Sequence, residues 1–232
     1  MWKMEYLQHQ FQRYFVENGA AEWWLNGLKS TLCITVIALL IGVILGFTVA
    51  IIRSQHERTG KLKILNGICR VYLSVIRGTP SMVQLLIFNF IIFASVALNE
   101  IVVGGIAFGV NSGAYVAEIV RSGIMSIDKG QMEAGRSLGL SAGQTMKLII
   151  MPQAFKNVLP ALINEMIVLL KETAIIGYIG TTDITKAATL VQSRTYSAYV
   201  PLLSAAVFYW VLVTILTYFT GKLERRLRKS ER

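Results

Sequence analysis

Two ionisable residues lie inside apolar stretches of the sequence, and they are the first candidates for chemistry. Glu165, next to Asn164, lies in an apolar run between Pro160 and Leu170. An ionised carboxylate at the centre of a bilayer costs on the order of 2.5 to 3.5 kcal/mol on insertion scales, so within a membrane it faces a cavity or a partner. We expect Glu165 and Asn164 to contact a ligand. The alternative is that Glu165 pairs with a basic residue and holds helices together.

Arg77 supplies the opposite charge. It directly precedes the Gly-Thr-Pro sequence at 78–80, and proline removes a backbone donor and clashes with the preceding turn, so a helix breaks here. A helix broken inside a membrane must line a cavity or a protein contact, and such breaks mark substrate sites in many transporters. Arg77 and Glu165 would together suit a zwitterion. Nearby side chains that offer hydrogen bonds are Ser74, Thr79 and Gln84. The alternative is that Arg77 only anchors one end of its helix at the membrane surface.

A third polar group ends another apolar stretch and consists of Tyr115, Glu118 and Arg121. We expect salt bridges of a gate or a coupling element here, and no substrate contact. Catalytic patterns are missing from the sequence: there is no GxxxxGKS/T loop, no HExxH and no GxSxG. The histidines, His9 and His56, lie in polar segments, and two cysteines without a Cys/His cluster do not form a metal site. We therefore expect no catalytic residue, no metal and no cofactor in this chain.

The elements that position these residues are membrane helices. The 232 residues are 54% apolar and only 16% charged, with a mean hydropathy of +0.55, which is too apolar for an ordinary soluble domain. The run 31–52 has no charge and, at about 1.5 Å per residue, crosses a hydrocarbon core of about 30 Å. The sequence predicts an all-α polytopic membrane protein with five transmembrane helices: 31–52, 69–98, 101–120, 148–170 and 199–220.

Charge placement orients the five predicted helices. With the N-terminus outside, the inner segments hold fourteen Lys and Arg residues and the outer segments hold six. Topology therefore accounts for the net charge of +10, and we expect no nucleic-acid partner. We divide the chain into an amphipathic outer-surface segment (1–26), a transmembrane domain (27–221) and a basic cytosolic tail (222–232). Glycines four residues apart, at 42 and 46 and at 105, 109 and 113, predict close helix packing rather than ligand binding.

The inner segment 121–147 is longer than a connection between two helices requires. Residues 127–138 predict a short helix that ends at Gly139, and Ser141 and Gln144 have the spacing of a capping box that starts the next helix. A short helix displayed on the cytosolic face is a natural docking element for a soluble partner. The alternative is a solvated amphipathic loop.

Four sequence blocks resemble a known family. Glu133-Ala134-Gly135, then Gly139, then Ile149-Ile150-Met151-Pro152 is similar to the EAA signature of the membrane subunits of bacterial ABC importers. The blocks at 77–84, 112–119 and 169–173 resemble permeases of polar amino acid importers of the histidine, glutamine and arginine type. The likeness runs from about residue 27 to residue 221. It implies that 127–141 is a coupling helix for an ATP-binding subunit, with contacts from Glu133, Ala134, Gly135, Gly139 and Leu140.

The resemblance implies the type I transmembrane domain of an ABC importer, in the bacterial cytoplasmic membrane. Its expected partners are two ATP-binding subunits, which would bind ATP and Mg, a second permease copy or homologue, an external substrate-binding protein, membrane lipid and a polar amino acid as substrate. Transport would proceed by alternating access. The competing hypothesis is a small channel or an ion-coupled secondary carrier that uses Glu165. A membrane-bound enzyme is disfavoured because the sequence lacks a catalytic grouping.

Overall fold

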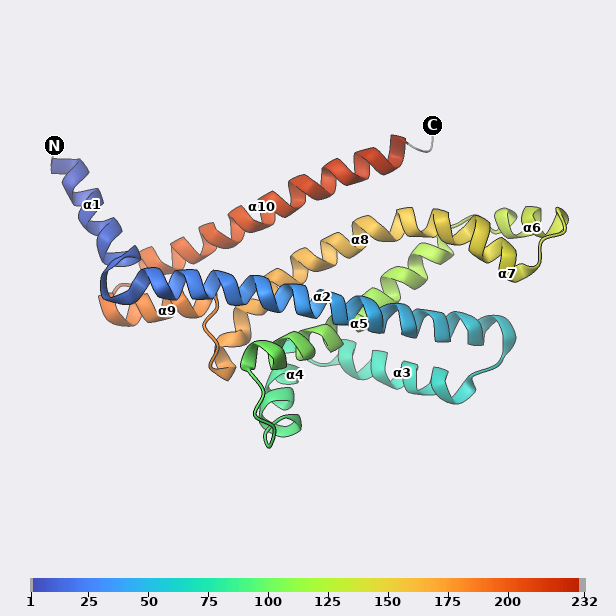
Figure 1. Cartoon of the computed structure of the whole chain (residues 1–232), viewed down its shortest axis with the longest axis horizontal. Helices are drawn as coiled ribbons and strands as arrows, with labels where there is room; N and C mark the ends of the chain where they lie inside the picture. Colours follow the sequence, from blue (N-terminus) through green and yellow to red (C-terminus); the bar gives the residue numbers. More distant parts are fainter. Residues whose placement is uncertain (1, 230–232) are drawn as a thin grey trace.

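The computed structural model describes residues 2–229, except for the side chains of residues 2–4, 6, 7, 18, 58 and 226–229. Every regular element in this part of the chain is helical (Figure 1). The elements are α1 (Trp2–Phe15), α2 (Ala20–Thr59), α3 (Lys63–Gly78), α4 (Ser81–Ile87), α5 (Glu100–Met125), α6 (Lys129–Ser137), α7 (Ala142–Thr145), α8 (Met151–Glu172), α9 (Ile184–Thr195) and α10 (Tyr199–Lys229). Short π-helical or 3-10 turns at Glu17–Gly19, Phe88–Ile92, Met146–Ile150 and Thr173–Ile179 join some of them.

Three helices are long and apolar enough to cross a membrane: Ala20–Glu57, Glu100–Met125 and Tyr199–Arg225. A fourth candidate is the pair formed by Lys63–Gly78 and Ser81–Ile92, which is bent by 111°. The all-helical membrane fold is thus confirmed, while the count of five transmembrane helices stays a prediction. The predicted span 148–170 corresponds to a π turn and α8, whose Lys156, Asn164 and Glu165 reduce its hydropathy.

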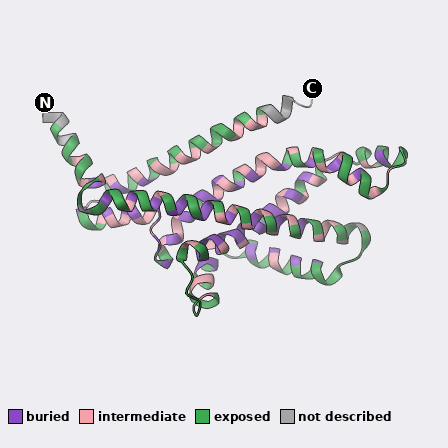
Figure 2. Cartoon of the chain, in the orientation of Figure 1, coloured by how far each residue is buried: buried purple, intermediate pink, exposed green. Residues whose placement is uncertain are grey.

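α2 and α5 pack against each other at the centre of the bundle (Figure 1). A Cβ atom at Gly46 of α2 would lie 2.4 Å from Val116 Cγ1, and one at Gly105 of α5 would lie 2.5 Å from Ile37 Cγ2. Any larger residue at these positions would therefore push the two backbones apart. The prediction that the spaced glycines serve helix packing is confirmed, and Figure 2 shows the buried residues along this contact.

The predicted break at 78–80 is confirmed as the bend between α3 and α4. Gln84 of α4 stabilises it, because its side-chain Nε2 donates 2.8 Å hydrogen bonds to the Ile76 carbonyl oxygen and to Thr79 Oγ1. Gln84 Oε1 in turn accepts a 2.9 Å hydrogen bond from Asn111 Nδ2 of α5. A buried amide thus satisfies carbonyl groups that the break would otherwise leave unpaired and attaches the bend to α5.

One end of the bundle is formed by α1, α9 and the start of α2 (Figure 1). Asp183 begins α9: its carboxylate accepts hydrogen bonds from the amides of Thr185 and Lys186 and from the Tyr209 hydroxyl of α10, at 2.9, 3.0 and 3.1 Å. Gly27 lets α2 approach, since a Cβ there would lie 2.6 Å from the Asp183 carbonyl oxygen. The Asp183 side chain is fully buried, and burial raises the pKa of this carboxyl.

The ends of the chain differ in detail from the predicted divisions. α1 ends at Phe15 and α2 already begins at Ala20, so the last part of the predicted surface segment 1–26 belongs to α2. α10 continues without interruption through Lys229, so the predicted tail 222–232 is an extension of α10 as far as the structure describes it. Residues 230–232 lie outside the described residues.

The opposite end of the bundle carries α6 and α7 (Figure 1). The predicted short helix, its end and its successor are confirmed: α6 spans Lys129–Ser137, Gly139 has a φ of +83°, and Ser141 and Gln144 form both hydrogen bonds of a capping box. A Cβ at Gly135 would lie 2.4 Å from Thr145 Cγ2 of α7. This contact explains why glycine stands where the EAA signature has its second alanine.

Candidate functional site

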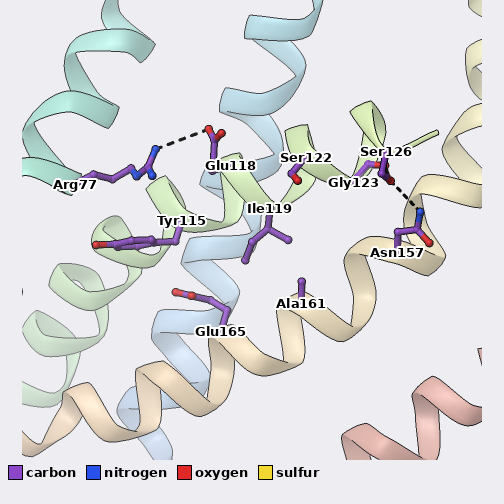
Figure 3. A pocket seen from close by; sticks show the side chains of 10 residues that line it. All are labelled: Arg77, Tyr115, Glu118, Ile119, Ser122, Gly123, Ser126, Asn157, Ala161 and Glu165. Atoms are coloured by element: carbon purple, nitrogen blue, oxygen red, sulfur yellow. Dashed lines mark hydrogen bonds and ion pairs between the residues drawn. The ribbon is translucent and has the colours of Figure 1, made fainter. Parts of the chain in front are cut away.

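A cavity of about 580 Å³ lies between α3, α5 and α8 (Figure 3). Its ionisable lining residues are Arg77 from α3, Glu118 from α5 and Glu165 from α8. Tyr115 lies between Arg77 and Glu165 in this view, and small residues such as Gly123 and Ala161 form the remaining wall. The structure therefore brings the two predicted substrate charges, Arg77 and Glu165, to one cavity, although they are far apart in the sequence.

Glu165 is buried, with 8% of its surface exposed. Ser112 Oγ of α5 donates a 2.8 Å hydrogen bond to Glu165 Oε1, which orients the carboxylate. Within the described part of the chain, no residue donates to Oε2 and no basic residue forms an ion pair with Glu165. The alternative that Glu165 braces the helices through a salt bridge therefore has no contact to support it, and the free oxygen is available to a ligand.

Arg77 is held loosely. Its Nη1 lies 3.9 Å from Glu118 Oε2, and its guanidinium carbon lies 6.0 Å from the centre of the Tyr115 ring. Almost half of the Arg77 side chain is exposed, at 46%. Direct charge-assisted hydrogen bonds are about 2.7 to 2.9 Å long. Arg77 and Glu118 are therefore close enough to attract each other but do not form a direct hydrogen bond.

Glu118 is shared between two arginines on different helices. Arg121, one turn further along α5, donates from Nε at 3.1 Å and from Nη2 to Glu118 Oε1. Arg121 Nη1 also contacts Met125 Sδ at 2.7 Å. Of the predicted grouping, Glu118 and Arg121 are in contact and Tyr115 lies beside Arg77, while the role of the three as a gate stays a prediction.

Four residues that the sequence suggested for substrate binding do not line this cavity. Thr79 and Gln84 take part in the hydrogen bonds at the break between α3 and α4, and Ser74 is exposed on α3. Asn164 lies on another face of α8, where it lines a groove against α10 with Thr217, Thr220 and Glu224. No observation tests a substrate role for these residues.

Three polar cavity residues were not singled out from the sequence: Ser122, Ser126 and Asn157. Asn157 Nδ2 donates a 3.0 Å hydrogen bond to Ser126 Oγ and so connects α8 with α5 (Figure 3). The sequence does contain a signal for them. Residues 118 and 122 of α5 and residue 126 directly after it are four apart, as are 157, 161 and 165 of α8, and this spacing places each set along one helix face. Polar or small residues at each of these positions indicate a continuous polar wall.

The predicted coupling residues lie beyond the ends of α5 and α8, two of the three helices that line the cavity. Glu133, Ala134 and Gly139 are exposed, Gly135 is buried and Leu140 is half-buried. In the chain, α6 and α7 connect α5 to α8, which line the cavity (Figure 1). In the part of the chain that the structure describes, no group of three or more His, Cys, Asp or Glu residues is arranged to hold a metal.

The chain is similar to a known protein family and to transport permeases of other bacteria. Residues 38–229 match the family described as "Binding-protein-dependent transport system inner membrane component". The "Arginine transport system permease protein ArtQ" of Bacillus subtilis is 40% identical over 209 residues, covering 89% of this chain and 93% of that protein. The "Glutamine transport system permease protein GlnP" of Escherichia coli K12 is 33% identical over 207 residues, covering 88% and 92%.

Solved structures agree with the sequence matches. The "Crystal structure of an amino acid ABC transporter with histidines" has a TM-score of 0.83 and 38% identity, covering 92% of this chain and 98% of that one. The MetNI methionine ABC transporter, with a TM-score of 0.76 and 18% identity, shares the fold. The chain belongs to the family of inner-membrane components of binding-protein-dependent transport systems. It is the membrane-embedded subunit of such a transporter, and the channel hypothesis is not favoured.

Proposed function

We propose that this chain is the permease subunit of an ABC importer that moves a polar amino acid across the bacterial cytoplasmic membrane. The observation that carries the proposal is the cavity with Arg77 and Glu165 on different walls, in a chain whose relatives include permeases named for arginine and glutamine. An amino acid has one carboxylate and at least one ammonium group. In this cavity Arg77 offers a cation for the carboxylate and Glu165 an anion for the ammonium, while the third charged residue, Glu118, lies beside Arg77.

In this proposal the substrate carboxylate binds Arg77 and the ammonium or basic side chain binds Glu165. Ser112 keeps Oε1 of Glu165 in place, so the carboxylate pays little rotamer entropy when the ligand arrives. Burial of Glu165 strengthens its ionic contact relative to the value of such a contact in water. Ser122, Ser126 and Asn157 offer further hydrogen bonds along the same cavity.

Transport is driven from α6. Of the two ATP-binding subunits, which bind ATP and Mg, one docks against α6 of this chain through the exposed Glu133 and Ala134. When these subunits close, α6 moves with them, and its connections to α5 and α8 change the distance between the cavity walls. The permease thereby alternates between outward-open and inward-open states.

A second permease copy or a homologue completes the membrane path. The groove between α8 and α10 is lined by Asn157, Asn164, Thr217, Thr220 and Glu224. Lipid tails cannot satisfy these polar groups, so protein rather than lipid covers the groove, while the exposed apolar residues of α10, such as Trp210 and Ile215, contact lipid or the partner. An external binding protein delivers substrate at the end formed by α1 and α9. The N-terminus then lies outside and the C-terminus in the cytosol.

The test is reconstitution of the chain with the subunits that co-purify with it from membranes. Proteoliposomes containing the whole complex should take up radiolabelled arginine, glutamine or histidine only when ATP is inside with the ATP-binding subunits. Mass spectrometry of the purified complex should identify an ATP-binding subunit. Uptake without ATP, or purification of the chain without an ATPase, would contradict the proposal and favour an ion-coupled carrier.

A further inference from the structure

Glu118 lies beside Arg77, the residue proposed to bind the substrate carboxylate. The Glu118 carboxylate therefore occupies a position next to the one that the substrate carboxylate would take. Its Oε2 lies 3.9 Å from Arg77 Nη1, on the wall of the same cavity that contains Glu165 (Figure 3). A substrate carboxylate that reaches Arg77 therefore meets a negative charge already in place.

The two members of this pair differ in how firmly they are held. Glu118 is anchored on α5 by Arg121, which donates twice to Oε1. Arg77, in the last turn of α3 before the bend, has no hydrogen-bond acceptor among the described residues and exposes almost half of its side chain. Arg77 is thus the member of the pair that can move, and Glu118 stays hydrogen-bonded to Arg121 when it does.

We propose that Glu118 is an internal competitor for the substrate carboxylate at Arg77 and thereby sets the affinity of the membrane site. In the empty cavity Arg77 pairs with Glu118. Substrate binding exchanges this partner for the substrate carboxylate, and release restores the pair. The inference rests on the proposed function and adds to it a residue that limits affinity and so promotes release.

The exchange is favourable for transport because a carrier must hold its substrate strongly enough to select it and weakly enough to release it. Without Glu118, no carboxylate of the described residues would compete with the substrate for the Arg77 guanidinium. With Glu118 present, the substrate has to separate Arg77 from Glu118 before it binds, and the free energy of that separation weakens substrate binding. This cost applies to ligands with a carboxylate and not to ligands that lack one.

The experiment compares Glu118→Gln with the unmodified permease complex, purified without its external binding protein, by calorimetry. The ligands are whichever of arginine, glutamine and histidine the complex transports, and its α-carboxamide, which keeps the ammonium and lacks the carboxylate. We expect Glu118→Gln to bind the amino acid about tenfold more tightly, equivalent to about 1.4 kcal/mol, and the amide with unchanged affinity. Glu100→Gln, an exposed carboxylate at the start of α5, is the matched control for net charge and should change neither.

Two further variants keep the result interpretable. Glu118→Asp retains the charge beside Arg121 but withdraws it from Arg77, so it should show the same carboxylate-selective gain if Glu118→Gln does not assemble. Arg77→Gln should bind the amino acid more weakly and should no longer distinguish it from the amide.

The outcomes separate this inference from the proposed function. Equal tightening of both ligands by Glu118→Gln, unchanged affinity for both, or weaker binding of the amino acid would overturn the competitor role while leaving the substrate site intact. Absence of amino acid binding in the unmodified complex and in every variant would instead remove the substrate site of the proposed function, and the competitor role with it.

Discussion

Ser112 Oγ of α5 donates a 2.8 Å hydrogen bond to Glu165 Oε1 of α8, inside the packed part of the bundle. This contact directs the buried carboxylate along one side of the cavity and leaves Oε2 for another partner. It also joins the two helices that α6 and α7 connect at the other end of the molecule (Figure 1). The orientation of Glu165 is therefore coupled to the relative position of α5 and α8.

Glu165→Gln should weaken amino acid binding to the purified complex by about tenfold to more than a hundredfold. The amide keeps the packing volume and removes the charge, and a hydrogen bond to a charged group is worth roughly 1.5 to 3 kcal/mol. Calorimetry without the external binding protein measures the membrane site directly. Ser112→Ala is the matched variant: it keeps the charge, loses only the orienting contact and should cost less. A lowered melting temperature with unchanged affinity in Glu165→Gln would assign the residue a purely structural role.

Glu133→Arg should leave the protein in the membrane and abolish ATP-driven uptake while ATP hydrolysis continues. The side chain is exposed on α6, so reversing its charge disturbs a docked partner without disturbing the bundle. Uptake and phosphate release, measured on the same proteoliposomes, report the coupling ratio. Normal uptake by this variant would remove α6 from the ATPase interface.

Gly135→Ala should also impair coupling, by a different route. The added methyl group would lie 2.4 Å from Thr145 Cγ2 and force α6 away from α7. Gly143→Ala is the control, because nothing lies within 4 Å of a Cβ there. We expect a reduced ratio of uptake to hydrolysis for Gly135→Ala and an unchanged ratio for Gly143→Ala. Equal ratios in both variants would show that the α6–α7 contact is dispensable.

Asp183→Ala should lower the melting temperature of the purified complex, with a loss of about 2 kcal/mol or more. It removes the N-cap of α9 and leaves the Tyr209 hydroxyl without this acceptor. Tyr209→Phe, which removes one of these bonds, should cost less.

Burial raises the pKa of Asp183, so at a pH between the unfolded and the folded pKa the folded chain binds a proton there that the unfolded chain has released. The stability difference between wild type and Asp183→Ala should therefore shrink as the pH rises through the raised pKa, and a constant difference would contradict this account.

Cysteines at Ser193 and Lys222 should react with a membrane-impermeant maleimide from opposite sides of the membrane. Ser193 lies in α9 and Lys222 near the end of α10, and both are exposed. In a background without Cys33 and Cys69, we expect labelling of position 193 in intact spheroplasts and of position 222 only in inside-out vesicles. Labelling of both from one side would refute the proposed orientation.

Local sequence determined much of the architecture. The helix break at 78–80, the end of α6 before Gly139 and the capping box of Ser141 and Gln144 were all predictable. Each depends on interactions within about four residues along the chain, which local sequence specifies. The long apolar helices followed from hydropathy, and the spacing of their glycines predicted close packing, although only the tertiary structure shows that α2 and α5 are the helices that meet there.

The composition of the cavity was decided by tertiary packing. Asn164 is the neighbour of Glu165 in the sequence, yet successive residues of a helix point about 100° apart, so Asn164 lines the groove against α10 and not the cavity, whereas Asn157 lines both. Gln84 could have faced a ligand, but the bend of α3 against α4 brings carbonyl oxygens within its reach. The contact of Arg77 with Glu118 likewise arises only where α3 crosses α5. Sequence alone identified the charged residues within the apolar stretches, whereas the packing angles of the helices determine which of them meet.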